Sequence, residues 1–445
     1  MSARYIERVT HIEQLLLIEK KVIDTNKLRE ECSYGVPDQL RPLCWRLFLD
    51  YLPKERQSWK NVLKQQRRDY IELVENLIVR PGEMEDEHEK EQRDLMDHPL
   101  ASESTSEWVN FFRDNEVLIQ IDRDVRRLRP EIQFFQKKTN YPLKSAARIN
   151  LAKRLSRDCL VADNEIQDSS FISSTSASTS SLQEDPESEY HWQVVERLLF
   201  IYSKVNPGVK YVQGMNELIG PIYFVFATDP DTEWAEHAEA DTFYCFQHLM
   251  SEIKDNFIKT LDKSNCGIEV VLNRFYERLQ AHDPQLYKKI AEEQSIKPQF
   301  YAFRWILLLL SQEFSLPDLI TLWDAVFSSK DRLDFVQYLC LVMLDSLREE
   351  LLNGDFSSNV RLLQNFPDFD VAYLIIKAHE QKNNNTNSNS ARSNSSSDAS
   401  DSSFNQQSNS NMTKTGGSRL FNSEKISAFV NGARAKLNNW KKEDI

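Results

Sequence analysis

Hydrophobic residues recur at intervals of three and four along most of the chain, a pattern typical of amphipathic helices. In residues 5–25, Ile6, Val9, Ile12 and Leu16 recur in this way among charged side chains. The same spacing predicts further helices over 59–78, 110–129, 192–205, 241–259, 266–281, 298–313, 316–327, 332–352 and 357–379. No convincing alternation with a period of two is present, so we predict an all-α protein built on a single large helical domain.

Two segments depart from this helical pattern. Residues 163–188 are rich in serine and acidic residues and lie between helical segments, so we expect a disordered insert within the domain. Residues 381–418 are an Asn/Ser tract that predicts a flexible linker. The pattern then returns over 419–445, where one face of an expected helix at 419–442 is apolar and the rest is basic. This tail is expected either to make peripheral contact with a membrane or a partner, or to pack back onto the domain.

The composition excludes several classes of function. The chain has only ten glycines among its 445 residues, and none of them forms a GxGxxG or GxxxxGK[ST] motif. The usual phosphate-binding loops are therefore missing, and any nucleotide chemistry is expected to take place on another protein's binding site.

The charge, the cysteines and the histidines exclude further kinds of partner and site. The net charge of −13 argues against a nucleic-acid partner. The six cysteines are isolated and the eight histidines are scattered, so neither a disulfide framework nor a metal site is expected. The N-terminus lacks a signal-peptide pattern, and no apolar run approaches the length of a membrane span. We therefore expect a cytoplasmic protein.

The first motif with candidate chemistry is IDRDVRRLRP at 121–130. Pro130 disfavours the α-helical conformation of Arg129, so the helix should end nearby and leave Arg127 in its last turn. Asp124 lies three residues before Arg127 and can hold its guanidinium. The alternative interpretation of these arginines is a solvated basic face.

The second motif is YVQGMNEL at 211–218, which follows a turn predicted by Asn206-Pro207-Gly208. A helix is expected to begin near Gly214, so that the carboxamide of Gln213 and nearby backbone groups can approach a ligand. Alternatively, these polar residues only cap the helix.

The third motif is GVP at 35–37 followed by LRPLCWR at 40–46. Its tryptophan and leucines are typical of a packed first core helix. Arg41 is expected to pair with a buried carboxylate or to contact a partner.

The three motifs, in this order, resemble the TBC (Tre-Bub-Cdc) domain of Rab GTPase-activating proteins. The matches are Arg41 to Trp45 for R-x-x-W if Pro42 is included, Ile121, Asp124 and Arg127 for I-x-x-D-x-x-R, and Tyr211, Gln213 and Gly214 for Y-x-Q-G, followed by Asn216. Asp241-x-Phe243-x-x-Phe246, Phe303-x-Trp305 and Leu322-Trp323-Asp324 match as well. The insert and the wide spacing of the first two motifs are similar to the member-13 branch of the family.

The resemblance implies a TBC domain of two helical subdomains over 35–350, with helical extensions at 1–34 and 351–380. It also implies a Rab in its GTP form as partner. Arg127 would be an arginine finger that stabilises charge on the γ-phosphate, and Gln213 a glutamine finger that orients the attacking water. The resemblance gives a supporting role to Asp124, Ile121, Tyr211, Gly214 and Asn216, and a Rab-binding or structural role to Arg41, Trp45 and Trp305.

GTP and Mg²⁺ would belong to the Rab, so no cofactor of the chain's own is expected. The chain would then be an activator of vesicle trafficking GTPases rather than an enzyme with its own substrate. Arg126 stands where many relatives carry proline, and Val212 where cysteine is common, but neither departure removes a finger. A non-catalytic Rab-binding scaffold or effector is the alternative, and the presence of both fingers argues against it.

Overall fold

The computed structural model describes residues 3–17, 22–78, 107–144, 150–155, 188–258, 261 and 267–395. Over these ranges the chain is helical and has no strand, and its β-type pairing is limited to two isolated bridges, Val22–Glu55 and Lys138–Tyr190. The predicted all-α fold is confirmed. The predicted insert at 163–188, apart from its last residue, and the predicted tail helix at 419–442 lie outside the described residues.

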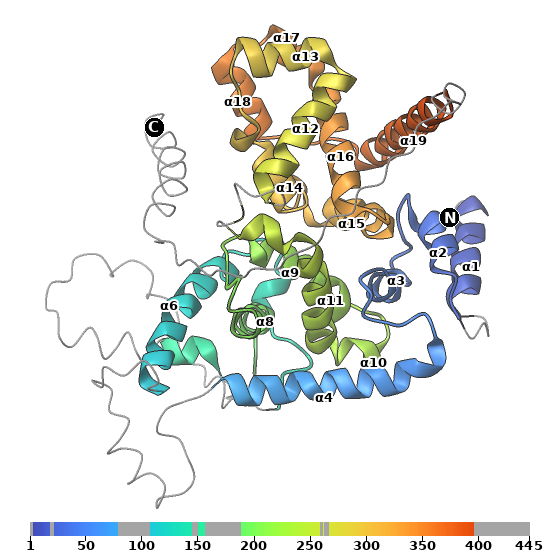
Figure 1. The fold of residues 1–445 in the computed structure, drawn as a ribbon. Coiled ribbons are helices and arrows are strands. Elements are labelled where there is room, and N and C mark those ends of the chain that lie inside the picture. Colours follow the sequence, from blue (N-terminus) through green and yellow to red (C-terminus); the bar gives the residue numbers. More distant parts are fainter. Residues whose placement is uncertain are drawn as a thin grey trace, which may run out of the picture. The chain divides into compact units, whose positions relative to one another are not determined.

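The N-terminal half forms one group of helices, drawn in blue to green in the lower and right-hand parts of Figure 1. Its elements are α1 (Ala3–Leu17), α2 (Thr25–Cys32), α3 (Arg41–Phe48), η1 (Arg56–Ser58), α4 (Trp59–Leu77), α6 (Glu107–Val125), η2 (Phe134–Gln136), α8 (His191–Val205), α9 (Met215–Ala227), α10 (Thr232–Ala235), α11 (Ala238–Ile253) and η3 (Lys254–Phe257). Helix α9 packs between α8 and α11, while α6 packs on α8 and α4 packs on α8 and α11. The two segments with candidate chemistry therefore belong to neighbouring elements of one group.

The C-terminal half forms a second group, drawn above the first in Figure 1. Its elements are α12 (Ile268–His282), α13 (Pro284–Tyr287), the π-helix η5 (Lys288–Glu293), η6 (Pro298–Phe300), α14 (Ala302–Leu307), α15 (Leu316–Ser328), α16 (Arg332–Ser346), α17 (Arg348–Asn353), α18 (Phe356–Gln364) and α19 (Val371–Ser395). Helix α15 contacts α2, α3 and α16, and therefore joins this group to the N-terminal elements.

Three predicted helices prove to be divided. The helix predicted over 298–313 is broken because Leu309 and Leu310 have φ angles of 50° and 64° in a tight turn that follows α14. The helix predicted over 332–352 is divided at Leu347. The helix predicted over 357–379 is divided across Pro367, because proline cannot donate the backbone hydrogen bond that a continuous helix needs.

Other predicted boundaries were also wrong. The helix predicted over 5–25 is not continuous, because residues 22–24 are not helical. Helix α2 begins at Thr25, where the Asp24 side chain accepts hydrogen bonds from two backbone N–H groups. The α-helix predicted over 241–259 ends at Ile253 and continues as a 3₁₀ turn. Residues 381–395 of the predicted flexible linker continue α19 as helix.

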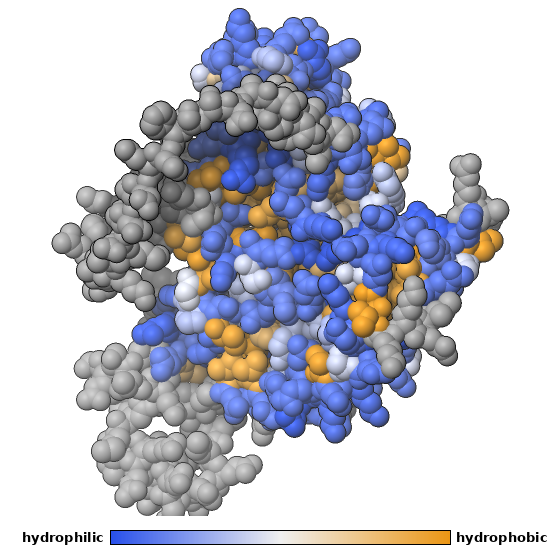
Figure 2. Space-filling view, turned by 45° about the vertical axis from the view of Figure 1, so that its right-hand side comes forward, coloured by the Kyte–Doolittle hydropathy of each residue, from blue (hydrophilic) through white to orange (hydrophobic). Residues whose placement is uncertain are grey.

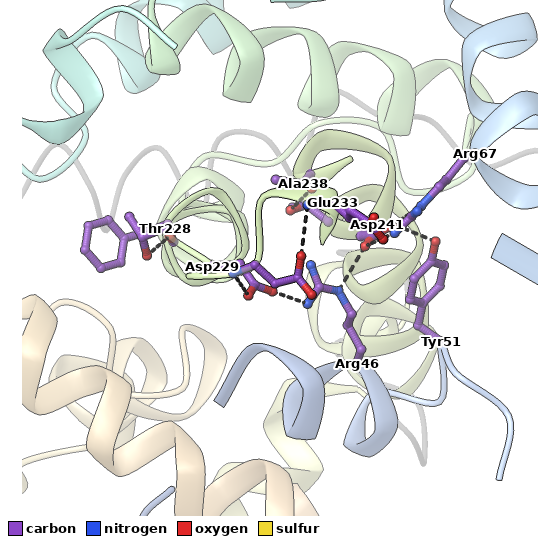
Figure 3. A network of polar contacts seen from close by, with 11 residues as sticks. Arg46, Tyr51, Arg67, Thr228, Asp229, Glu233, Ala238 and Asp241 are labelled. Carbon is purple, nitrogen blue, oxygen red and sulfur yellow. Dashed lines mark hydrogen bonds and ion pairs between the residues drawn. The ribbon is translucent and has the colours of Figure 1, made fainter. Parts of the chain in front are cut away.

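A buried ion cluster ties α3, α4 and α11 together (Figure 3). Asp241 accepts hydrogen bonds from Arg46 at 2.9 Å, from Arg67 at 2.9 and 3.0 Å, and from the Tyr51 hydroxyl at 2.7 Å. Asp229 binds the other side of Arg46 at 2.7 Å. Every charge in this cluster has a partner of opposite sign, which is the condition for burying charged groups.

The face of the molecule seen in Figure 2 is mainly hydrophilic, with separate hydrophobic patches. The apolar side chains are largely in a continuous core that includes Trp45, Trp305 and Trp323, each fully buried. Among the helices described, none combines the length and the hydrophobicity that a membrane crossing requires.

Candidate functional site

The arginine motif lies in a turn immediately after α6. The helix ends at Val125, earlier than predicted, and the N–H of Arg127 donates to the carbonyl of Asp124 at 3.3 Å. Arg129, directly before Pro130, has a φ of 47°. This left-handed conformation stops the helix and costs roughly 1–3 kcal/mol in a residue other than glycine. Arg127 therefore lies beyond the helix rather than in its last turn.

The Asp124 carboxylate collects side chains from both motifs. Its Oδ2 accepts a hydrogen bond from the Tyr211 hydroxyl at 2.7 Å. Its Oδ1 accepts from Arg127 Nη2 and from Gln213 Nε2, each at 3.4 Å, and the Asn216 amide donates to its backbone carbonyl, also at 3.4 Å. The structure thus brings together, on one carboxylate, residues that are up to 89 positions apart in sequence.

Exposure separates the residues of this cluster. The Arg127 side chain is 72% exposed, whereas that of Asp124 is 9% exposed. Gln213 is also exposed, while Tyr211 and Asn216 are buried. Burial and the adjacent Asp124 charge raise the pKa of Tyr211, so its hydroxyl remains a hydrogen-bond donor. Two exposed groups are therefore held, through long hydrogen bonds, by a buried support.

The neighbouring arginines have other partners, which argues against a uniformly solvated basic face. Arg126 binds both carboxylate oxygens of Asp122 at 2.8 Å, and its guanidinium lies 4.3 Å from the centre of the Trp192 ring. Arg129 is buried. Arg127 is thus left with a 3.0 Å bond to the Arg123 carbonyl and its long contact with Asp124.

The glutamine motif depends on a glycine at the start of α9. Gly214 is the N-cap and has a φ of 106°, a conformation that side chains disfavour. A Cβ at this position would lie 2.9 Å from Leu308 Cδ2. The predicted helix start is confirmed, and Gly214 allows the turn that carries Gln213 to pack closely on the residues after α14.

Ile121 is fully buried on α6 and contributes to the core beneath the arginine turn. A second close contact lies nearby, since a Cβ added at Gly220 of α9 would meet Leu128 Cδ2 at 2.9 Å. Sequence reasoning missed this contact between Leu128 and Gly220. It also missed the buried side chain of Arg129, for which the sequence carries no signal, because a pre-proline position restricts only the backbone.

The third motif has a structural role in the described residues. Arg41 Nε binds both oxygens of the buried Asp324 at 3.0 and 3.1 Å, and Trp45 Nε1 donates to the same carboxylate at 2.7 Å. Arg41 therefore pairs with a buried carboxylate, one of its two expected roles. Trp45 and Trp305 are both fully buried, so neither presents a surface to a partner.

Over the described residues, no three His, Cys, Asp or Glu side chains are grouped so that they could hold a metal ion. The exposed groups of the site are instead a guanidinium and a carboxamide. A guanidinium can bind phosphate oxygens through a forked pair of hydrogen bonds, and a carboxamide can both donate and accept. The arrangement is suited to binding charged oxygen atoms and water presented by another molecule.

Known proteins are similar to this chain in sequence and in fold. The model of the Rab-GTPase-TBC domain matches residues 163–352, a range that includes Gln213 and begins after Arg127. The chain is 44% identical over 402 residues to TBC1 domain family member 13 from Homo sapiens, covering 86% of this chain and 100% of that protein. It is 45% identical over 402 residues, with the same coverage, to TBC1 domain family member 13 from Mus musculus.

Among solved structures, the Ypt/Rab-GAP domain of Gyp1p has the same fold, with a TM-score of 0.60 at 21% identity, covering 85% of this chain and 98% of that domain. The expected resemblance to the member-13 branch is confirmed by the two mammalian relatives. The chain belongs to the Rab-GTPase-TBC domain family.

Proposed function

We propose that the chain accelerates GTP hydrolysis by a Rab-type GTPase in its GTP form, inserting Arg127 and Gln213 into the partner's nucleotide site. The observation that carries this proposal is that both exposed side chains share one buried acceptor, Asp124 Oδ1, at 3.4 Å. Membership of the Rab-GTPase-TBC domain family supports the general function of regulating Rab GTPases in membrane traffic.

Arg127 would stabilise the charge that develops on the γ-phosphate. Its 3.4 Å contact with Asp124 is long, and its side chain is 72% exposed. Exchanging this contact for phosphate oxygens therefore loses little. An arginine supplied in trans raises the rate of GTP hydrolysis by about 10³–10⁵-fold, or about 4–7 kcal/mol of barrier.

Gln213 would orient the attacking water. Its amide nitrogen donates to Asp124 at 3.4 Å, which favours an orientation of the carboxamide with its oxygen directed away from Asp124. The carbonyl oxygen can then accept a hydrogen bond from water, while the partner's own residues hold GTP and Mg²⁺. In this proposal the chain needs no cofactor and converts no substrate of its own.

Single-turnover GTP hydrolysis over a panel of Rab proteins tests the proposal. We expect the chain to accelerate at least one Rab, and the double variant Arg127→Ala/Gln213→Ala to return that Rab to its intrinsic rate. If the double variant still binds the Rab, the lost acceleration lies in the hydrolysis step and not in binding. If no Rab is accelerated, or if the double variant keeps the wild-type rate, the proposal is wrong, and binding without acceleration would favour the scaffold alternative.

A further inference from the structure

Arg129 has an unusual position for an arginine in an exposed turn. It lies two residues after Arg127, yet its side chain is only 7% exposed. Its backbone adopts a φ of 47° directly before Pro130, which disfavours an ordinary helical or left-handed conformation at this position. The surrounding contacts must therefore hold this conformation.

The Arg129 guanidinium binds the tight turn that follows α14. Its Nη1 donates to the Phe314 carbonyl at 3.0 Å, and its Nη2 donates to the Ser311 carbonyl. It makes a longer contact of 3.4 Å with Glu131. Carbonyls of one segment are thus fixed by a charged group of another, and such charge-assisted hydrogen bonds are stronger than neutral ones.

The same guanidinium reaches the first turn of α9. Arg129 Nε lies 3.5 Å from the Glu217 carboxylate, and the backbone N–H of Glu217 donates to the Gly214 carbonyl at 3.0 Å. Burial raises the pKa of Glu217, and the Arg129 charge opposes that change. Arg129 is therefore connected to the helix start that carries Gln213.

Both partners of Arg129 also support Gln213. The turn after α14 supplies Leu308, which is in such close contact with Gly214 that a Cβ there would lie 2.9 Å away. Glu217 belongs to the helix that starts immediately after Gly214. Arg129 thus spans three segments, namely the turn of Arg127, the start of α9, and residues 308–314.

We propose that Arg129 is a positioning residue that sets the spacing between Arg127 at the γ-phosphate and Gln213 at the attacking water. This inference rests on the function proposed above. Two groups from different segments act on one reaction most effectively when the distance between the segments is fixed before the partner binds. Asp124 holds the two side chains through long contacts, whereas Arg129 connects the segments that carry them.

The test measures single-turnover GTP hydrolysis at increasing concentrations of the chain, giving a maximal rate and a half-saturating concentration. A displacement of about 1 Å from the reactive geometry costs about 10²-fold in rate. We therefore expect Arg129→Met to lower the maximal rate by about 10²-fold with little change in the half-saturating concentration. Arg129→Lys keeps the charge and is expected to give an intermediate rate.

Arg29→Met is the matched control. Arg29 also binds backbone carbonyls through a partly buried guanidinium, at 2.6 Å to Phe327, 3.3 Å to Ser329 and 3.1 Å to Phe48. None of these carbonyls belongs to the three segments that Arg129 joins. Arg29→Met is expected to lower the melting temperature and to keep the maximal rate.

Glu217→Gln tests the same bridge from α9 and decides the question if Arg129→Met does not fold. It removes the charge and keeps the size, and we expect the maximal rate to fall by about threefold to tenfold. A maximal rate that is unchanged in the folded Arg129 and Glu217 variants, or a change confined to the half-saturating concentration, would overturn the positioning role. Arg127→Ala in the same assay separates the two proposals, because only its failure to lower the rate would contradict the finger assignment itself.

Discussion

Asp124 and Asp241 are two buried carboxylates that each accept a 2.7 Å hydrogen bond from a tyrosine hydroxyl, yet their surroundings differ. Asp241 is closed in by Arg46 and Arg67 at 2.9–3.0 Å (Figure 3). The Arg46 side chain is fully buried. Its position between two aromatic rings, with its guanidinium 4.3 and 4.5 Å from their centres, leaves no route to another molecule.

Around Asp124 the same residue types are arranged in the opposite way. Arg127 and Gln213 approach the carboxylate only to 3.4 Å, and both side chains are exposed. The Asp241 cluster encloses its arginine, as a structural cluster does. The Asp124 cluster leaves its arginine exposed, as the proposed finger role requires.

The largest expected effect is on the hydrolysis rate, when a substitution removes the arginine of the exposed Asp124 cluster without unfolding the chain. Arg127→Ala should lower the maximal rate of Rab GTP hydrolysis by about 10³–10⁵-fold, because the γ-phosphate charge loses its compensating guanidinium. Its free energy of unfolding should change by less than about 0.5 kcal/mol. Urea unfolding and single-turnover hydrolysis on the same preparation measure both, with Arg126→Ala as the neighbouring control. A large loss of stability in Arg127→Ala would remove the distinction between the two clusters.

The reverse experiment breaks the enclosed cluster. Asp241→Ala leaves Arg46 and Arg67 without their shared carboxylate, so we expect a loss of about 3–5 kcal/mol in the free energy of unfolding. Urea denaturation monitored by tryptophan fluorescence measures it. At a temperature where the variant is still folded, its maximal hydrolysis rate should remain near that of wild type. A stable variant that has lost activity would contradict the structural role of Asp241.

A buried titratable group should affect stability alone. Burial lowers the pKa of His191 to about 4, and its Nδ1 lies 2.8 Å from the Tyr223 hydroxyl. The unfolded chain therefore binds a proton below about pH 6.5 that the folded chain refuses, so stability falls as the pH drops from about 6.5 toward 4. We expect a loss of about 2 kcal/mol between pH 7 and 5, measured by urea unfolding, and a smaller loss in His191→Gln. Equal losses in both proteins would exclude His191 as the cause.

Removing one hydroxyl from each cluster gives the smallest expected effect. Tyr211→Phe removes the hydrogen bond to Asp124, which should contribute about 1 kcal/mol. If that free energy is lost from the transition state, the maximal hydrolysis rate falls by roughly threefold to tenfold. Tyr51→Phe removes the equivalent bond to Asp241 and should lower the melting temperature while keeping the rate. The contrast would be lost if both variants changed the rate equally.

Sequence periodicity was sufficient to predict the helical fold and the long helices such as α4 and α8. The order of the motifs was sufficient to identify the residues that meet at Asp124. The break at Leu309 and Leu310 could not be predicted, because it depends on partners distant in sequence, including Trp323 Nε1, which donates to the Leu309 carbonyl at 2.9 Å. The enclosed position of Arg129 was missed for the same reason, since its carbonyl partners are 182 and 185 residues away.

The most direct test of the exposed cluster is the position of Arg127 in a complex with a GDP-bound Rab and aluminium fluoride, which stands in for the transferring phosphoryl group. We predict that a guanidinium nitrogen of Arg127 has left Asp124 and lies about 2.7–2.9 Å from the fluoride group, with the Gln213 carboxamide beside the attacking water. A complex in which Arg127 remains on Asp124 and another group contacts the fluoride would contradict this prediction.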